Sequence, residues 1–437
     1  MRVSSNHRFL THADGRPFCY LGDTAWELFH RLNRAEATFY LEQRAAQGFT
    51  VIQAVLLAEL DGLRVPNAQG DLPLIELDPT KLNEPYFAHV DWVIDKAAAL
   101  GLQLGLLPTW GDKWNKGEWG AGPEIFTPEN ARAYGELLGR RYADSPLIWI
   151  VGGDRVVENE RHHTIIRAMA EGLRAGDGGH HLISFHPRGG GASSEYFHEA
   201  GWLDFNMVQS GHARNRDNYH MISADYGRVP IKPCMDAEPG YEDHPAGFDL
   251  NNGYLDDYDA RKALYWALFA GAHGHTYGCH PIWQFWDTGR VPISAARRRW
   301  HEAVALPAAS HMRHAHALLH SRPIFSRIPD QNLLADGAGE GTYHTRACRA
   351  ADGRYALIYM PVGGELRVNT AALVGAALVA HWFDPRTGTA QRIGTHTRGD
   401  EATFTAPAGG PDWVLVLDDA ARGFAAPGGA SIDERDE

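Results

Sequence analysis

The sequence predicts an α/β fold, a (β/α)₈ TIM barrel followed by a small all-β antiparallel sandwich. Between roughly residues 15 and 320, short apolar runs typical of buried strands alternate with stretches of helical periodicity. A polar or aromatic residue follows nearly every one of these runs. After residue 320 the pattern changes to short alternating segments separated by turn residues. We therefore expect a barrel over residues 1–320, a sandwich over 321–420, and a disordered tail of small and charged residues over 421–437.

Eight apolar runs predict the parallel strands of the barrel, at residues 18–22, 49–57, 102–107, 147–151, 182–185, 204–208, 231–235 and 275–278. In such a barrel the C-terminal ends of all strands meet on one face, which carries the active site. The side chains at or shortly after these ends therefore mark the expected site, and their common phase favours a closed barrel over an open sheet. They are Asp23, Glu59, Trp110, Asp154, His186, Gln209, Glu238 and Trp283.

Helices are expected between the strands, at residues 35–47, 86–100, 128–142, 161–175 and 258–270. A glycine just past a periodic segment is the usual signal for the end of a helix, and four of the five segments are followed by one. In the C-terminal part, residues 355–360, 366–369, 378–384, 402–405 and 413–417 predict the strands of the sandwich.

Charge and hydropathy exclude two classes of partner. The chain has 437 residues and a formal net charge of −13, which offers no electrostatic footprint for a phosphate backbone. It also lacks a basic amphipathic stretch that would hold it on an anionic membrane. Its first residues contain no apolar signal region, and no run of about 18 apolar residues occurs. We expect a cytoplasmic protein that binds neither nucleic acid nor membrane. An exported protein whose signal has been removed is the alternative, and the oligomeric state stays open.

Cysteine and histidine patterns argue against a metal. The four cysteines are widely spaced and form no CxxC pair, so neither a disulfide framework nor a zinc site is expected. The 24 histidines include clusters at residues 162–163, 180–181 and 311–320, but none has a carboxylate at HExxH spacing. We expect no catalytic metal and no cofactor. Thirteen tryptophans favour a carbohydrate ligand, since aromatic rings cover the apolar faces of sugars, although tryptophans also serve as core residues.

Two carboxylates are the candidates for chemistry. Glycoside hydrolysis needs a pair of carboxyl groups, separated by about 5–5.5 Å for retention of configuration and about 6.5–9.5 Å for inversion. Asp154 follows two glycines that allow a sharp turn after the fourth strand, and Glu238 follows the seventh strand. Alternatively, Asp154 caps the next helix and Glu238 is a surface loop residue. Asp236 and Glu242 are nearby competitors.

Seven further residues are expected to bind substrate. The hydroxyl groups of a sugar could form hydrogen bonds with Asp23, His186, Gln209 and Tyr241. Its ring could stack on a platform formed by Trp110, Trp283 and Trp286. For Asp23 a structural salt bridge is an equal alternative. For His186 and each tryptophan, ordinary core packing is the alternative.

Four segments resemble the apiosidase-like proteins of glycoside hydrolase family 140: RFLTHADGRPFCYLGDTAWELFHRL, LIWIVGGDR, PCMDAEPGYE and WFDPRTG. The resemblance extends to about residue 420. It implies a (β/α)₈ barrel joined to a C-terminal β-sandwich of a type once described as collagen-binding. It also implies an exo-acting β-apiosidase that releases D-apiose from plant or pectic glycosides.

The resemblance further implies that Asp154 is the acid/base and Glu238 the nucleophile of a retaining mechanism. The wider clan more often has Asn-Glu after the fourth strand, whereas this chain has Gly153-Asp154. Two other functions stay open: hydrolysis of another β-furanoside or β-pyranoside, and carbohydrate binding without catalysis. The sandwich is expected to be a rigid packing partner and not a collagen binder.

Overall fold

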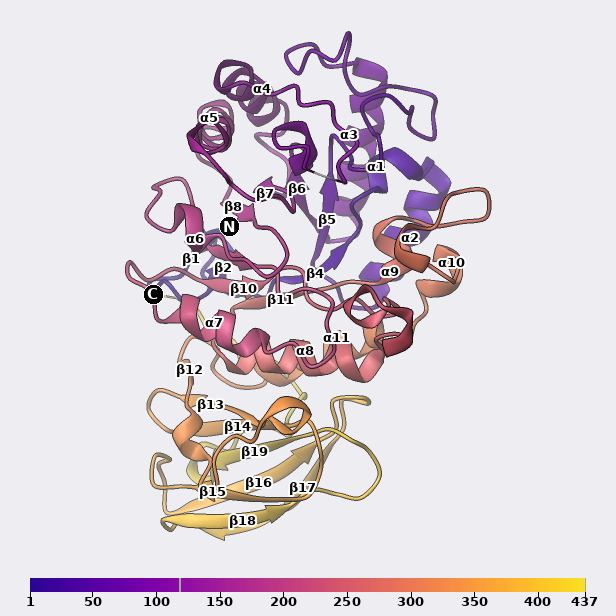
Figure 1. The fold of residues 1–437 in the computed structure, drawn as a ribbon. Coiled ribbons are helices and arrows are strands. Elements are labelled where there is room, and N and C mark those ends of the chain that lie inside the picture. Colours follow the sequence, from indigo (N-terminus) through magenta and orange to yellow (C-terminus); the bar gives the residue numbers. More distant parts are fainter. Residues whose placement is uncertain (118, 437) are drawn as a thin grey trace.

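A computed structural model describes residues 1–117 and 119–436 and confirms a barrel followed by an antiparallel β domain (Figure 1). Eight parallel strands form one nearly closed sheet in the order β8-β7-β6-β5-β4-β11-β10-β9. The gap between β8 and β9 is bridged by a hydrogen bond from Asp204 N to Ile183 O (2.9 Å). The strands are β4 (Leu21–Thr24), β5 (Val51–Val55), β6 (Gln103–Leu107), β7 (Leu147–Gly152), β8 (Ile183–His186), β9 (Asn206–Val208), β10 (Cys234–Asp236) and β11 (Gly274–Tyr277).

Successive side chains along each strand point alternately into the barrel and outward to the helices, so the core has an inner and an outer layer. On β5, Val51 and Val55 point into the barrel, while Ile52 and Ala54 face the surrounding helices. Gln53 also points inward, where its amide donates to Thr276 Oγ1 at 2.9 Å. Both faces of the strands are therefore buried, which explains why they read as continuous apolar runs.

Six long helices surround the barrel: α2 (Arg34–Ala46), α3 (Glu84–Ala99), α4 (Pro128–Arg141), α5 (Glu160–Asp177), α8 (Asp257–Phe269) and α11 (Pro307–His320). Helices α4 and α5 cross in very close contact because glycines line both faces. A Cβ on Gly139 would lie 2.5 Å from Leu173 O, and one on Gly172 would lie 2.2 Å from Arg132 O. The shorter helices are α1 (Leu28–Arg31), α6 (Ser194–Phe197), α7 (Asn218–Tyr226), α9 (His280–Trp283) and α10 (Trp300–Ala303).

The C-terminal domain packs a six-stranded sheet against a two-stranded one, with a separate apolar core between them. The large sheet has the order β12 (Arg327–Pro329), β13 (Arg346–Ala350), β14 (Tyr355–Met360), β19 (Trp413–Asp419), β16 (Ala377–Phe383) and β17 (Ala390–Thr397). The small sheet pairs β15 (Glu365–Asn369) with β18 (Glu401–Thr405). Strands β12, β13 and β17 were not predicted from the sequence.

The C-terminal domain lies next to helix α8 (Figure 1), and buried polar contacts hold the two together. Arg261 donates to both carboxylate oxygens of Asp412 (3.0 and 3.1 Å), and the Trp266 indole donates to His344 O at 2.7 Å. The rings of Tyr265 and Tyr359 stack at 4.8 Å. These buried contacts tie the domain to the barrel as a packed unit.

The end of the chain corrects the prediction of a disordered tail. Residues 421–436 return to the barrel, where Ile432 N donates to His320 O (2.9 Å) and Glu434 Oε2 accepts from Ile324 N (2.6 Å). The carboxylate of Asp436 accepts from Ser5 Oγ at 2.6 Å, close to the small N-terminal sheet of β1 (Arg2–Val3), β2 (Leu10–Thr11) and β3 (Pro17–Phe18). Composition cannot reveal such contacts. Within the described residues, no helix is both long and apolar enough to cross a membrane.

Candidate active site

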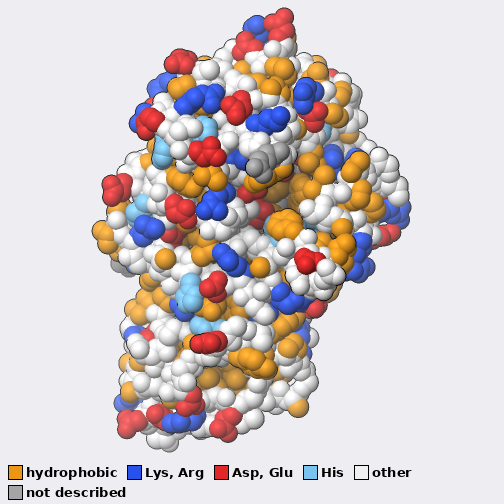
Figure 2. Space-filling view, viewed as in Figure 1, with side chains coloured by type: hydrophobic (Ala, Val, Ile, Leu, Met, Phe, Trp, Pro, Cys, Tyr) orange, Lys and Arg blue, Asp and Glu red, His pale blue; other side chains and the backbone are white. Residues whose placement is uncertain are grey.

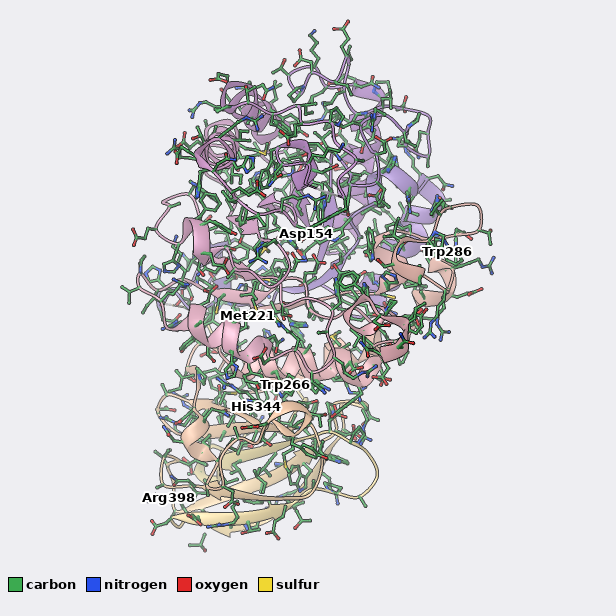
Figure 3. All side chains as sticks on the ribbon, in the orientation of Figure 1. Asp154, Met221, Trp266, Trp286, His344 and Arg398 are labelled. Carbon is green, nitrogen blue, oxygen red and sulfur yellow. The ribbon has the colours of Figure 1, made fainter. Side chains whose placement is uncertain are left out.

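A cavity of about 800 Å³ opens at the C-terminal ends of the barrel strands. Figure 2 shows a hollow on this face with acidic side chains inside it, and Figure 3 labels Asp154 over the middle of the barrel. Six of the predicted site residues line this cavity, which brings together side chains from distant segments of the chain. They are Trp110, Asp154, Gln209, Glu238, Tyr241 and Trp283.

The turn that presents Asp154 depends on two glycines. At the end of β7 and directly after it, the backbone takes positive φ values at Gly152 (103°), Gly153 (105°) and Asp154 (45°). A Cβ on Gly152 would lie 2.5 Å from His186 O, and one on Gly153 would lie 2.8 Å from Gly111 N. Only glycine fits both positions, and the non-glycine Asp154 is held in a conformation that such residues seldom adopt. Asp154 is one of eleven described non-glycine residues with a positive φ, and it is the one expected to act in catalysis.

The surroundings of Asp154 favour its protonated form. Its Oδ1 accepts a hydrogen bond from Gly189 N at 3.0 Å, and a quarter of its side chain is exposed to the cavity. Burial and the negative charge of Glu238 raise the pKa of Asp154 to about 6, against the opposing effects of His186 and Arg155. Asp154 can therefore hold a proton under mildly acidic conditions.

Glu238 is kept ionised by two histidines. Its Oε2 lies 3.1 Å from His186 Nε2, and its Oε1 lies 3.4 Å from His212 Nε2. Burial alone would raise the pKa of Glu238, but the contacts with His186 and His212 outweigh it and lower the pKa to about 2. The two carboxyl groups thus have opposite tendencies within one cavity, which is the arrangement that separates an acid from a nucleophile or base.

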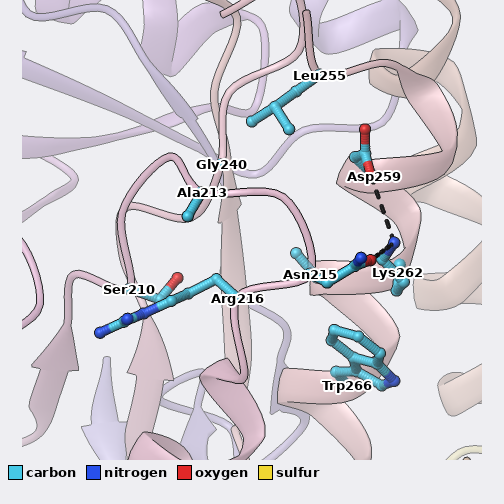
Figure 4. Close-up of a pocket in the computed structure, with 10 residues that line it drawn as sticks. Ser210, Ala213, Asn215, Arg216, Gly240, Leu255, Asp259, Lys262 and Trp266 are labelled. Carbon is cyan, nitrogen blue, oxygen red and sulfur yellow. Dashed lines mark hydrogen bonds and ion pairs between the residues drawn. The ribbon is translucent and has the colours of Figure 1, made fainter. Parts of the chain in front are cut away.

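Polar contacts with helix α8 hold the loop that carries His212 (Figure 4). Arg214 pairs with Asp259, and Lys262 Nζ donates to Asn215 Oδ1 and lies 3.3 Å from Asp259 Oδ1. These contacts surround a small cavity of about 20 Å³ outside the active site. Because these contacts hold the residues next to His212, they support the position of the imidazole that contacts Glu238.

Tyr241 packs beside the same histidine. Its ring lies 4.4 Å from the ring of His212 and lines the cavity. The ring fits because residue 278 is a glycine: a Cβ there would lie 1.8 Å from Tyr241 Cδ1. The backbone after β11 therefore determines where this aromatic side chain stands.

Two predicted substrate-binding residues lie elsewhere, which corrects those predictions. Asp23 is fully buried on the outer face of β4, where its Oδ2 accepts from Arg44 Nε (2.6 Å) and from Tyr40. It is the structural salt-bridge partner considered as its alternative. Trp286 follows α9 at the edge of the barrel, beside α10, and donates its indole N–H to Arg290 O at 3.0 Å (Figure 3).

The remaining candidates separate clearly. His186 is completely buried and contacts Glu238 from beneath the cavity surface. Asp236 points toward helix α7, where it accepts from Ser210 Oγ (2.7 Å) and Asn218 Nδ2 (2.9 Å). Glu242 accepts from Tyr277 OH at 2.6 Å. Asp236 and Glu242 therefore form hydrogen bonds within the protein and do not line the cavity.

Several lining residues were not among the predicted site residues. Glu59 was recognised as a strand end but was not assigned a role, although the rule about strand ends could have identified it. Residues without a sequence signal, most of them in loops, complete the wall: Trp26, Trp119, Arg155, His212, His244, Phe248 and His280.

One cluster of metal-binding side chain types occurs outside the cavity. Within the described part of the chain, Cys19, His316 and His320 have ligand atoms within 4.8 Å of one another. Cys19 lies just before β4 and the two histidines lie on α11, away from the cavity lining. They therefore have no part in the chemistry considered for Asp154 and Glu238.

Comparisons with known proteins agree with this geometry. Residues 4–326 match the family described as "Apiosidase-like, catalytic domain", and residues 328–418 match "Putative collagen-binding domain of a collagenase". A solved structure titled "Glycoside hydrolase" is 34% identical with a TM-score of 0.88, and the alignment covers 96% of this chain and 97% of that one. A structure titled a family 5 glycoside hydrolase from Bacteroides vulgatus is 31% identical with a TM-score of 0.90, covering 99% and 95%.

A third structure, titled "putative glycoside hydrolase" from Bacteroides vulgatus, shares the fold at 17% identity, with a TM-score of 0.70 and coverage of 96% and 82%. A search of curated proteins found no match.

Proposed function

Because this chain belongs to the apiosidase-like family and is a glycoside hydrolase, we propose that it is a retaining, exo-acting β-apiosidase. Its substrate in this proposal is a plant or pectic glycoside that ends in D-apiose. The observation that carries the proposal is the pair of carboxyl groups with opposed protonation tendencies in one cavity. Asp154 has a pKa raised to about 6 and Glu238 a pKa lowered to about 2.

The reaction takes two steps. Glu238, ionised between His186 and His212, attacks the anomeric carbon while Asp154 donates its proton to the glycosidic oxygen, and the leaving group departs as an alcohol. In the second step Asp154 accepts a proton from water, which attacks the anomeric carbon and releases Glu238 as a carboxylate. The charge on Glu238 disappears in the glycosyl-enzyme, so the pKa of Asp154 falls and the group becomes ready to act as a base.

The shape of the cavity supports removal of a terminal sugar. Phe248 lies 5.5 Å from the His212 ring, and Ile293 and Ser294 line the same cavity. His280 Nε2 contacts the carbonyl oxygens of Ile293 and Ser294 at 3.1 and 3.0 Å. We infer that these groups enclose a single sugar ring at the part of the cavity near His212 and Glu238, and leave no room for a continuous chain.

The test is hydrolysis of a panel of aryl glycosides with one common leaving group. We expect 4-nitrophenyl β-D-apiofuranoside to be cleaved far faster than the matching β- and α-arabinofuranosides, β-xyloside and β-glucoside. Asp154→Asn and Glu238→Gln should each lose at least about a thousandfold in kcat. Faster cleavage of another glycoside would replace apiose as the sugar, and near-full activity of both variants would overturn the assignment of residues.

A further inference from the structure

The cavity contains a buried guanidinium that the proposed mechanism does not use. Arg155 is only 2% exposed; its Nη1 donates to Asp154 O at 2.7 Å. Its Nε and Nη2 atoms are buried and have no hydrogen-bond partner among the described residues. A buried N–H group without a partner is unfavourable, so such groups at a ligand cavity are suited to donating to a bound molecule.

A third carboxyl group lies in the same cavity. Glu59 lines the wall after β5, and no hydrogen bond within the described part of the chain uses its carboxyl group. Burial, and next the charge of Asp154, raise the pKa of Glu59 to about 8. At neutral pH Glu59 is therefore mainly a neutral acid whose O–H can donate to a ligand.

An exposed indole completes this side of the cavity. Trp119 is 68% exposed, and the guanidinium carbon of Arg155 lies 4.7 Å from the centre of its ring. Trp119 lines the cavity together with Glu59 and Arg155. A large aromatic surface left open beside buried donors is the usual surface on which a sugar ring stacks.

The position of these three residues identifies what they would bind. An acid/base group protonates the glycosidic oxygen, so the leaving group lies on its side of the scissile bond. Arg155 adjoins Asp154, whereas Tyr241, His212 and Phe248 enclose the end near Glu238. We propose that Glu59, Arg155 and Trp119 form a subsite for the leaving group, and that this subsite takes a sugar ring.

The chemistry of the donors favours that ligand. The N–H groups on Nε and Nη2 of Arg155, which have no partner among the described residues, and the O–H of Glu59 match hydroxyl oxygens of a sugar whose face stacks on Trp119. The cavity is also lined by charges of both signs, Arg155 and Arg188 against Glu158, so hydrogen bonding to hydroxyl groups and stacking on Trp119, not net charge, define this subsite. The inference rests on the proposed function because it needs Asp154 to act on the glycosidic oxygen.

Binding without turnover tests the subsite. In the Glu238→Gln protein, calorimetry measures Kd for β-D-apiofuranosyl-(1→6)-D-glucose and for D-apiose. We expect the disaccharide to bind at least tenfold more tightly than apiose. Added to this background, Trp119→Ala, Arg155→Met and Glu59→Leu should each weaken disaccharide binding at least fivefold and change apiose binding less than twofold. Glu59→Gln retains a donor and should bind the disaccharide within threefold of the parent.

Two matched variants control for general effects. Tyr343→Ala removes another aromatic side chain, 67% exposed, from the sheet domain, and Glu76→Leu removes an exposed carboxylate; neither should change either Kd. Equal weakening of apiose and disaccharide by the three subsite variants, or no weakening by any of them, would overturn the subsite. If wild-type protein cleaves no apioside and the Glu238→Gln protein binds neither ligand, the proposed function fails, and the subsite fails with it.

Discussion

Replacing Gly278 by alanine should disable the site through the neighbouring Tyr241. The new Cβ would lie 1.8 Å from Cδ1 and 2.1 Å from Cε1 of the Tyr241 ring. Carbon atoms in contact normally stand about 3.5–4 Å apart, so the ring must move by roughly 1.5–2 Å. It packs on His212, which contacts Glu238 at 3.4 Å. A misplacement of about 1 Å can cost about 100-fold in rate, so we expect kcat/KM to fall about 100-fold, or about 2.7 kcal/mol.

A double-mutant cycle isolates this steric cause. Four proteins are compared: wild type, Gly278→Ala, Tyr241→Ala, and the double variant. Without the ring there is nothing to collide with, so Gly278→Ala should cost less than about threefold in the Tyr241→Ala background. Circular dichroism and thermal melting establish that all four are folded. The reasoning is refuted if Gly278→Ala is harmless in wild type, or if it lowers kcat/KM by the same factor in both backgrounds.

Three further predictions follow from the geometry. First, kcat/KM should fall tenfold per pH unit above an apparent pKa of about 6, because Asp154 must be protonated. It should stay flat down to about pH 4, because Glu238 loses its charge only near its pKa of about 2. A pH profile with an acid limb near pH 5 would contradict this. Second, His212→Ala removes one of the two contacts that lower the pKa of Glu238, so the acid limb should move to higher pH; an unmoved limb would show that His212 does not act on Glu238. Third, Gly172→Ala should lower the free energy of unfolding, measured with denaturant, by about 1–3 kcal/mol, because the Cβ would lie 2.2 Å from Arg132 O. This is opposite to the usual preference of a helix for alanine over glycine, which is about 1 kcal/mol. An unchanged or higher midpoint of the denaturant transition would disprove the close crossing of α4 and α5.

The barrel could be predicted because its strands are buried on both faces. An apolar run such as Leu147–Gly152 is then visible without alternation, and the residue after it reports the active face. The sandwich was harder: β17 (Ala390–Thr397) is a polar strand at the edge of its sheet, with little burial to create a pattern. Helix α7 (Asn218–Tyr226) was missed because polar residues interrupt its apolar positions.

The two candidate catalytic carboxyl groups could be predicted because they lie within two positions of the C-terminal end of a strand. Asp154 and Glu238 satisfy that rule, and Asp23 satisfies it equally well but points outward to Arg44. A shift of one residue along the strand decides whether a side chain points into the barrel or outward to the helices, and in a four-residue strand the composition does not show which residues point inward. His212 comes from a long loop whose path depends on anchors to α8, so nothing local to its sequence marks it.

The stereochemical course of the reaction tests the central claim most directly. In buffer containing methanol, ¹H NMR of the first product formed from 4-nitrophenyl β-D-apiofuranoside identifies the anomer of the methyl glycoside, which does not interconvert. Double displacement by Glu238, with Asp154 as acid and then base, predicts the methyl β-glycoside. Formation of the α-glycoside, or of free α-apiose as the only initial product, would contradict the retaining mechanism.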